Sequence, residues 1–299
     1  MPPELAQSLQ HFHDVTGPGL YVVAVLLMLL EGVAVPLYFR RWGVFNHWGG
    51  VVSSVCGLLT NVLSIAAFLL LYLQVMQVSW THRLWDLGTG PVAWIVSFLL
   101  FDLMWYLAHR MGHRVRLFWC FHGVHHTDEE MRLTTAIRGS AIEFLYLPWF
   151  FVWIPLLGIH PLILLATEPL SRLWGFLSHV SPRWFGKTNW LDPWLITPSL
   201  HRVHHGRNAE YLDTNYAQVF SLWDRLLGSY RTETVAPEYG VLQPVDTNSL
   251  WDVQTAAFRA LWRDMRAAPS GWDAMQCALR PPDWKAGSVS PLASPAQSR

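Results

Sequence analysis

Apolar residues along this chain are gathered into long runs. Residues 20–39, 51–76 and 92–107 are each almost continuously hydrophobic, and two shorter runs at 144–157 and 162–177 flank the sequence Gly158-Ile159-His160-Pro161. A helix rises about 1.5 Å per residue, so about 20 apolar residues cross a hydrocarbon core about 30 Å thick. The two shorter runs read as a helical hairpin that need not cross fully. The pattern therefore predicts an all-α integral membrane protein with about four to five transmembrane or re-entrant helices.

Polar residues interrupt this pattern at a few informative places. Glu31 stands inside the first run, either as a group facing the bundle or a lipid path, or as an acid near one end of the span. Gly90-Pro91 is a turn signal before the third run. Near the carboxyl end a predicted amphipathic helix could rest on the membrane or on the rest of the protein. Its apolar stripe is Trp251, Phe258, Leu261, Trp262 and Met265, beside Arg259, Arg263 and Arg266.

These boundaries divide the chain into three regions. Residues 1–91 form an N-terminal membrane region with two spanning helices, and residues 92–232 form a central domain that carries the candidate chemistry. Residues 233–299 form an amphipathic segment and a flexible tail rich in Pro, Ser and Ala.

Composition supports a membrane environment. The 299 residues are 52% hydrophobic and 14% charged, whereas soluble domains carry about a quarter charged residues. The formal net charge is zero, which gives no indication of nucleic-acid binding. Cys56, Cys120 and Cys277 show no pairing pattern, so neither a disulfide framework nor a zinc knuckle is indicated.

Basic residues predict the orientation in the membrane. Arg40 and Arg41 follow the first span and several arginines follow the third, whereas Arg83 alone stands in the loop between the second and third. By the positive-inside rule the third span ends on the cytoplasmic side, together with the C-terminus. Arginine greatly outnumbers lysine, with Lys187 and Lys285 the sole lysines. This bias favours a bacterial source and hence the inner membrane.

Eight of the fourteen histidines lie in three short motifs at the end of the third span and beyond it. H-R-M-G-H contains His109 and His113, four residues apart and therefore on one helix face. H-G-V-H-H and H-R-V-H-H each present three imidazoles from one helical turn, His122, His125 and His126 in the first and His201, His204 and His205 in the second. His179, at the cytoplasmic end of the hairpin, is a ninth candidate.

Neutral imidazole is a ligand for iron, zinc, copper and nickel. Eight or nine converging imidazoles exceed what one metal ion coordinates, so the motifs predict a cytoplasmic helical cap that holds a di-metal site. Any one of these histidines alone would more often be an ordinary core or surface residue. The repeated spacing favours metal binding, although spacing alone permits zinc as well as iron.

Four further polar residues are candidates for orienting the imidazoles. Asp102 lies two helical turns before His109 on roughly the same face, and Asp213, Asn215 and Asp224 follow the third motif. Carboxylates and amides commonly hold the second nitrogen of a ligating imidazole. The competing interpretations are an ordinary buried aspartate for Asp102 and solvated turn residues for the other three.

The flanks of the motifs carry a family resemblance. Y-L-A-H-R-M-G-H, F-H-G-V-H-H-T-D, T-T-A-I-R, T-P-S-L-H-R-V-H-H and D-T-N-Y…L-W-D-R-L-L-G-S-Y occur in this order between residues 92 and 230. The chain resembles the sterol desaturase and fatty acid hydroxylase superfamily. The resemblance implies a histidine-ligated di-iron oxygenase that takes a lipid from the bilayer, uses O2 and receives electrons from a separate reductase or other external donor. Gly175 stands where the family often has a polar residue.

Several activities are compatible with this resemblance. Hydroxylation of an aliphatic lipid ranks first, with sterol-type desaturation and ether-lipid cleavage of the alkylglycerol monooxygenase type as alternatives. Outside oxygenases, a haem electron carrier would need histidines that face each other within the bilayer. A metal transporter would need ligands near mid-membrane on discontinuous helices. The position of the motifs at helix ends favours the oxygenase.

Overall fold

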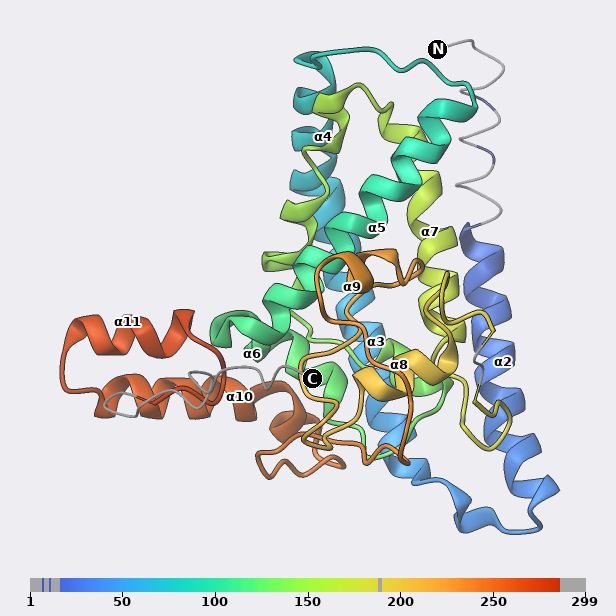
Figure 1. Ribbon diagram of the computed structural model, residues 1–299, viewed down its shortest axis with the longest axis vertical. Coiled ribbons are helices and arrows are strands. Elements are labelled where there is room, and N and C mark those ends of the chain that lie inside the picture. The colour runs from blue at the N-terminus through green and yellow to red at the C-terminus, as the bar shows by residue number, and fades with distance from the viewer. Residues whose placement is uncertain (1–6, 8–10, 12–16, 188–189, 286–299) are drawn as a thin grey trace.

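The computed structural model describes residues 7, 11, 17–187 and 190–285, and every regular element among them is helical (Figure 1). An isolated antiparallel bridge joins Leu195 to Phe220. In Figure 1 long helices form a bundle along the height of the view, and shorter helices gather beside its lower half. The predicted all-α membrane fold with a helical cap is confirmed. The predicted tail at 286–299 lies outside the described residues.

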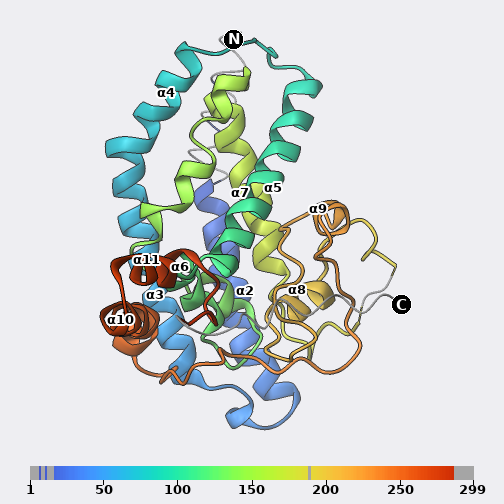
Figure 2. The same ribbon diagram turned by 60° about the vertical axis from the view of Figure 1, so that its left-hand side comes forward.

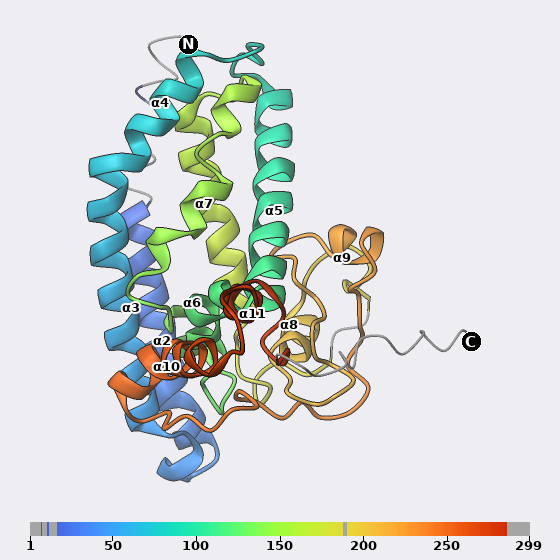
Figure 3. The ribbon, with the colours of Figure 1, turned by 90° about the vertical axis from the view of Figure 1, so that its left-hand side faces the viewer.

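Among the described residues, three helices are long and apolar enough to cross a membrane. These are α2 (Gly17–Tyr38), the continuous pair α3 (His47–Ala67) and α4 (Leu73–Thr81), and α5 (Pro91–Arg114). A π-helical turn at Phe68–Tyr72 joins α3 to α4, and Figure 3 shows α3 and α4 as one column opposite α5. Pro91 stands at the first turn of α5, where its missing N–H costs nothing.

The predicted hairpin is helical in its second arm. α7 (Pro161–Leu177) is a regular helix that packs on α5. The first arm differs from a continuous helix, because it consists of the short 3-10 segments η5 (Glu143–Leu145), η6 (Leu147–Phe150) and η7 (Ile154–Leu157). Pro148 and Pro155 stand at the first turns of η6 and η7, and a proline cannot donate the hydrogen bond that would continue a preceding helix.

The cap is built from short helices that follow the third span. α6 (Arg116–His126) turns back against α5, and α8 (Pro198–His204) and α9 (Leu222–Leu226) follow the hairpin. The side chain of Thr197 caps α8 by accepting a hydrogen bond from the Leu200 amide. In Figure 2, α6 lies beside the end of α5, and α8 and α9 lie on its other side.

The amphipathic helix rests on the cap. α10 (Leu250–Ala267) packs on α6, and Leu261 is buried together with Cys120 and Cys277. Trp251 and Trp262 are exposed, so the apolar stripe proposed from the sequence is buried in part. A further helix, α11 (Gly271–Leu279), lies within the stretch that the sequence suggested was tail. Ser270 caps it by accepting a hydrogen bond from the Asp273 amide.

Glu31 is a structural link between α2 and the cap. Its side chain is 5% exposed, and its two oxygens accept hydrogen bonds from the amides of Leu133 (2.7 Å) and Ser181 (2.9 Å). Ser181 lies two residues after His179. Of the two interpretations of Glu31, the structure favours the group that faces the bundle.

Candidate metal centre

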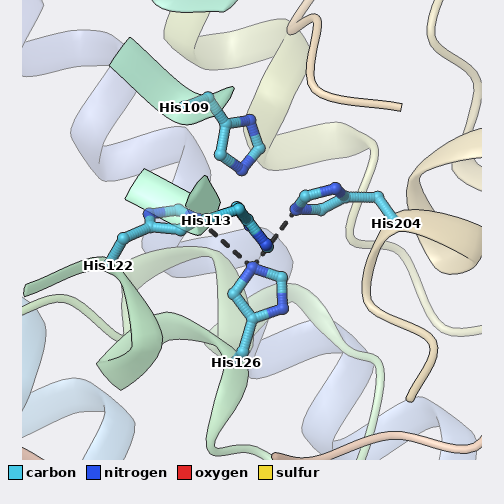
Figure 4. A group of neighbouring side chains, drawn as sticks. All are labelled: His109, His113, His122, His126 and His204. Atoms are coloured by element: carbon cyan, nitrogen blue, oxygen red, sulfur yellow. Dashed lines mark hydrogen bonds between the residues drawn. The ribbon is translucent and has the colours of Figure 1, made fainter. Parts of the chain in front are cut away.

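All nine candidate histidines converge in two groups. His109, His113, His122, His126 and His204 form the first group, and His125, His179, His201 and His205 form the second. Within each group the nitrogens that could bind a metal lie within 4.8 Å of one another. Figure 4 shows the first group, with side chains from α5, α6 and α8 pointing toward a common centre. The groups are adjacent, since the rings of His126 and His205 stack with centroids 4.4 Å apart.

Each of the two H-x-x-H-H motifs contributes histidines to both groups. His122 and His126, at i and i+4, belong to the first group, and His125 belongs to the second. In the later motif His201 and His205 belong to the second group, and His204 belongs to the first. Neighbouring helical residues point about 100° apart, so each H-H dipeptide reaches both centres. This geometry explains why a triplet, rather than a pair, recurs in the sequence.

Backbone carbonyls fix the direction of several imidazoles. The Nδ1 atoms of His109, His179 and His204 lie 2.7–2.8 Å from the carbonyl oxygens of Tyr216, Gly175 and Thr214 respectively. A carbonyl can only accept, so each of these Nδ1 atoms carries the proton and each Nε2 carries a lone pair. The lone pairs therefore point into the groups.

The donor set fits metal ions. The Nε2 atoms of His109, His113 and His205 are buried without a hydrogen-bond partner. Other Nε2 atoms face each other at 3.0 Å (His201 and His179) and 3.2 Å (His204 and His126). Nε2 of His179 and of His204 has no proton to donate, so each presents a lone pair to this space, where a bound cation would accept it. Nine nitrogens and no carboxylate in the two groups favour a metal that prefers imidazole, such as iron or zinc.

Burial keeps these imidazoles neutral. Loss of hydration lowers the pKa of His125 to about 4 and that of His204 to about 3, and it lowers the pKa of His122, His126 and His205 well below the usual value. A metal ligand must be unprotonated. At neutral pH these imidazoles are therefore unprotonated and able to bind metal.

These shifts predict acid sensitivity of the metal-free protein. An unfolded chain protonates its histidines near pH 6.5, whereas His125 in the folded chain resists protonation until about pH 4. Between these values the unfolded state binds more protons, so the free energy of unfolding should fall as the pH falls from 6.5 toward 4 and should be nearly constant above 7.5. Thermal unfolding of chelator-treated protein at pH 8, 6.5 and 5 measures this. Equal midpoints at all three would contradict it.

Asp102 supports the site without touching an imidazole directly. It is fully buried on α5 and accepts hydrogen bonds from the amides of Val219 (2.9 Å) and Phe220 (3.0 Å) and from the indole of Trp223 (3.0 Å). It thereby joins the third span to the segment after Tyr216, whose carbonyl holds His109. Its bonds match the ordinary buried aspartate more closely than a direct partner of an imidazole.

The other three polar candidates lie around the same loop. Asp224 accepts hydrogen bonds from the amides of Tyr216 and Ala217, and the side-chain amide of Asn215 donates to the Leu200 carbonyl at 3.0 Å. Both residues are buried, which excludes the solvated-turn interpretation for them. Asp213 pairs with Arg114 at 2.8 Å, and its carboxylate lies 3.8 Å from His113 Nδ1, beyond hydrogen-bond distance.

The sequence around these residues matches a known family. A family model described as fatty acid hydroxylase matches residues 94–229, the part of the chain that contains all nine histidines. The chain belongs to the sterol desaturase and fatty acid hydroxylase superfamily. With its three long apolar helices, this member of the superfamily is an integral membrane protein.

Several characterised members of the superfamily are similar to this chain. An alkylglycerol monooxygenase of Xenopus tropicalis is 34% identical over 204 residues, which are 68% of this chain and 44% of that protein. The ornithine lipid hydroxylase OlsE of Rhizobium tropici is 29% identical over 46% of this chain and 41% of its own length. Human lathosterol oxidase is 28% identical over 57% of this chain and 56% of its own. The chain thus spans about half the length of these relatives. No solved structure matches it.

Gly175 makes room for a residue that sequence reasoning missed. A Cβ atom at position 175 would lie 3.1 Å from Cγ and Cδ of Gln218. Gln218 is 5% exposed and donates to Ser171 Oγ at 2.9 Å. The position at which superfamily members often have a polar side chain is therefore covered here by a polar side chain from a distant segment. Gly175 also supplies the carbonyl that holds His179.

Proposed function

We propose that the protein is an O2-dependent lipid hydroxylase that holds two iron ions, one in each histidine group. The observation that carries this proposal is the pair of buried imidazole groups whose Nε2 lone pairs converge. Two irons, when bound, would supply the oxidation of an unactivated C–H bond by O2. All nine histidines are the proposed ligands, and Asp102, Asp213, Asn215 and Asp224 position them or their loops.

The residues of this chain would perform the remaining tasks. The carbonyls of Tyr216, Thr214 and Gly175 hold three imidazoles in one tautomer, so that a metal meets nitrogen lone pairs without rearrangement. Burial of the groups excludes bulk water from the reaction. The site lies where α5 leaves the predicted bilayer, so a lipid chain can reach it sideways while its head group stays at the interface.

We also propose an orientation of the protein in the membrane and a source of electrons. The distribution of arginines supports a site and a C-terminus on the cytoplasmic side, in a bacterial inner membrane. Electrons would come from a separate reductase or carrier. The histidines lie at the end of α5 and on the short helices α6 and α8, which supports an oxygenase over a haem carrier or a transporter.

Oxidation of an ether lipid is a second candidate. The similarity to alkylglycerol monooxygenases extends over 68% of this chain, compared with 46% for the ornithine lipid hydroxylase and for human cholesterol 25-hydroxylase. The additional coverage supports an alkylglycerol-like substrate. The same site chemistry would serve either substrate, and desaturation remains compatible with it.

Lipid mass spectrometry under 18O2 tests the proposal. Membranes from cells that express the chain should contain a lipid heavier by one 18O atom, or an aldehyde and free glycerol released from an ether lipid. The His201→Ala variant should produce neither. A purified protein with stoichiometric zinc, no iron and no O2 consumption would contradict the proposed function.

A further inference from the structure

A groove lies between the C-terminal half of α2 and the N-terminal half of α3, in the lower half of Figure 1. It encloses about 490 Å³, and the 3-10 helix η4 (Leu133–Ile137), which packs on both α2 and α3, contributes to its wall. Most of the lining is apolar or small, namely Met28, Gly32, Phe45, Gly50, Val51, Val55 and Leu58, and the polar lining residues are Glu31, His47, Ser54, Arg132 and Thr134. The metal centre uses none of these side chains. We call this space the α2–α3 groove.

The α2–α3 groove reaches from the membrane interface into the bilayer. Trp42 and Trp48, beside the start of α3, are exposed, and exposed tryptophans commonly lie at the level of the lipid head groups. Leu58 is also exposed and stands eleven residues after His47, which is about 16 Å along a helix. One end of the groove is therefore placed for the polar part of a lipid, and the other end for its chain.

Arg132 has hydrogen-bond donors without partners in the wall of the groove. Its side chain is buried, and its Nε and Nη2 have no hydrogen-bond partner among the described residues. Nη1 lies 3.1 Å from a carboxylate oxygen of Glu130, whereas Nη2 lies 3.8 Å from the carboxylate of Asp128, beyond hydrogen-bond distance. Thr134 Oγ1 is likewise buried and has no partner in the described part of the chain. Two neighbouring polar side chains thus keep unused donors.

Glycines of α3 place the guanidinium group of Arg132 against the groove. A Cβ atom at Gly49 would lie 3.1 Å from Nη2, and one at the lining residue Gly50 would lie 3.5 Å from Nη1 and 3.8 Å from Nη2. On another side the guanidinium lies 5.6 Å from the centroid of the Phe45 ring, which also lines the groove. Buried donors normally have partners. A ligand oxygen in the groove would supply the partner that Arg132 lacks.

The charges around the groove favour an uncharged head. Among the lining residues Arg132 is positive and Glu31 is negative, and Glu130 already pairs with Arg132. Both oxygens of Glu31 accept backbone amides, so the groups left for a ligand are donors. A phosphate or carboxylate would meet two acidic side chains beside one guanidinium, whereas hydroxyl, ether and ester oxygens accept hydrogen bonds without that repulsion.

Glu31 also connects the groove to the second histidine group. One of its oxygens accepts from the amide of Leu133, which stands between Arg132 and Thr134. The other accepts from the amide of Ser181, two residues after His179. The wall that carries the unused donors is therefore tied to the segment that carries a proposed metal ligand.

We infer that the α2–α3 groove binds the lipid substrate, and that Arg132 and Thr134 donate hydrogen bonds to the oxygens of an uncharged head such as a glycerol ether or ester. The inference rests on the proposed lipid-oxidising function and adds the binding site and the substrate class to it. The apolar lining of α2 and α3 holds part of the chain.

Competition binding to the full-length protein in nanodiscs tests this inference, with O2 excluded so that no turnover occurs. A photoreactive hexadecylglycerol is displaced by hexadecylglycerol, hexadecyl phosphate, hexadecylamine or hexadecane, which share one chain and differ in the head. Hexadecylglycerol should bind at least about tenfold more tightly than the other three, as hydrogen bonds to a charged group commonly provide. Peptide mass spectrometry should find the photolabel on α2, α3 or η4.

Two variants test the groove itself. Arg132→Met removes the donors and should weaken binding of hexadecylglycerol at least about tenfold, with hexadecane unchanged. Gly32→Trp should fill the groove and abolish labelling, and the fold should accept it because a Cβ atom at Gly32 would meet no described atom within 4 Å. Gly19→Trp is the matched control, since Gly19 is on the same helix, has the same open surroundings and is not a lining residue. It should bind like the wild type.

The outcomes separate the binding site from the proposed function. The thermal midpoint of each variant is measured first, and if Arg132→Met is destabilised, Gly32→Trp decides the case. Unchanged binding in folded Gly32→Trp protein, or a photolabel on other elements, would overturn the groove as the binding site. Equal affinities, or tighter binding of hexadecyl phosphate, would overturn the uncharged head. The expected order in a protein that never oxidises a lipid would support the binding site and contradict the oxygenase.

Discussion

Replacing His201 by alanine is expected to reduce bound iron from about two ions per chain to about one or fewer, and to reduce lipid oxidation at least about a hundredfold. Loss of a residue that merely supports a ligand commonly costs 10–100-fold in metal affinity or activity, and loss of a direct ligand costs at least as much. His201 belongs to the four-membered group, which has fewer nitrogens to spare. Metal analysis and product formation are the two measurements.

The two groups should respond separately. His204→Ala removes a nitrogen from the five-membered group and should reduce iron there, so either variant alone reports on one centre. His82→Ala is the matched control, because His82 is exposed at the end of α4 and belongs to none of the three motifs. Full iron content in the His201 or the His204 variant would remove that residue from the ligand set.

Replacing Arg138 by methionine is expected to lower the free energy of unfolding by about 3–5 kcal/mol, the usual cost of removing one partner from a buried ionic network. Arg138 is fully buried. It donates to Thr127 Oγ1 (2.8 Å), to Ser53 Oγ (3.2 Å) and to the carbonyl of Thr247 (2.8 Å), and its guanidinium lies 3.8 Å from the carboxylate of Asp128. These partners come from α3, the end of α6 and the segment before α10.

The Arg138 variant should also lose iron, because Arg138 holds Thr127, two residues after His125, through its hydrogen bond to Thr127 Oγ1. Arg138→Lys should recover little, since an ammonium group cannot reproduce the planar fork of donors. Arg207→Met is the control: Arg207 is 42% exposed and pairs with Glu238 at 3.6 Å, which contributes about 1 kcal/mol or less. Thermal unfolding in detergent compares the three. A wild-type midpoint for Arg138→Met would contradict this account of the network.

The histidine site could be predicted from the sequence because the spacing of histidines within short motifs is enough to indicate it. A spacing of four residues places His109 and His113 on one helix face, and the repeated triplet predicts shared chemistry without knowledge of the fold. The three long spans could likewise be predicted, because hydropathy and helical rise together determine them.

Contacts between distant segments could not be predicted in the same way. T-T-A-I-R was recognised as a motif, but the partners of Arg138 come from positions 53, 127 and 247 and meet only in the fold. The sequence places Asp102 on roughly the same helix face as His109, yet its bonds to Val219, Phe220 and Trp223 depend on how the loop after α8 returns to α5. Pro148 and Pro155 interrupt an apolar run that hydropathy alone describes as continuous.

Anomalous X-ray scattering at the iron absorption edge tests the central claim most directly. The account predicts two iron peaks, one among His109, His113, His122, His126 and His204, and one among His125, His179, His201 and His205. A single peak, peaks that appear at the zinc edge instead, or iron bound away from these nine imidazoles would contradict it.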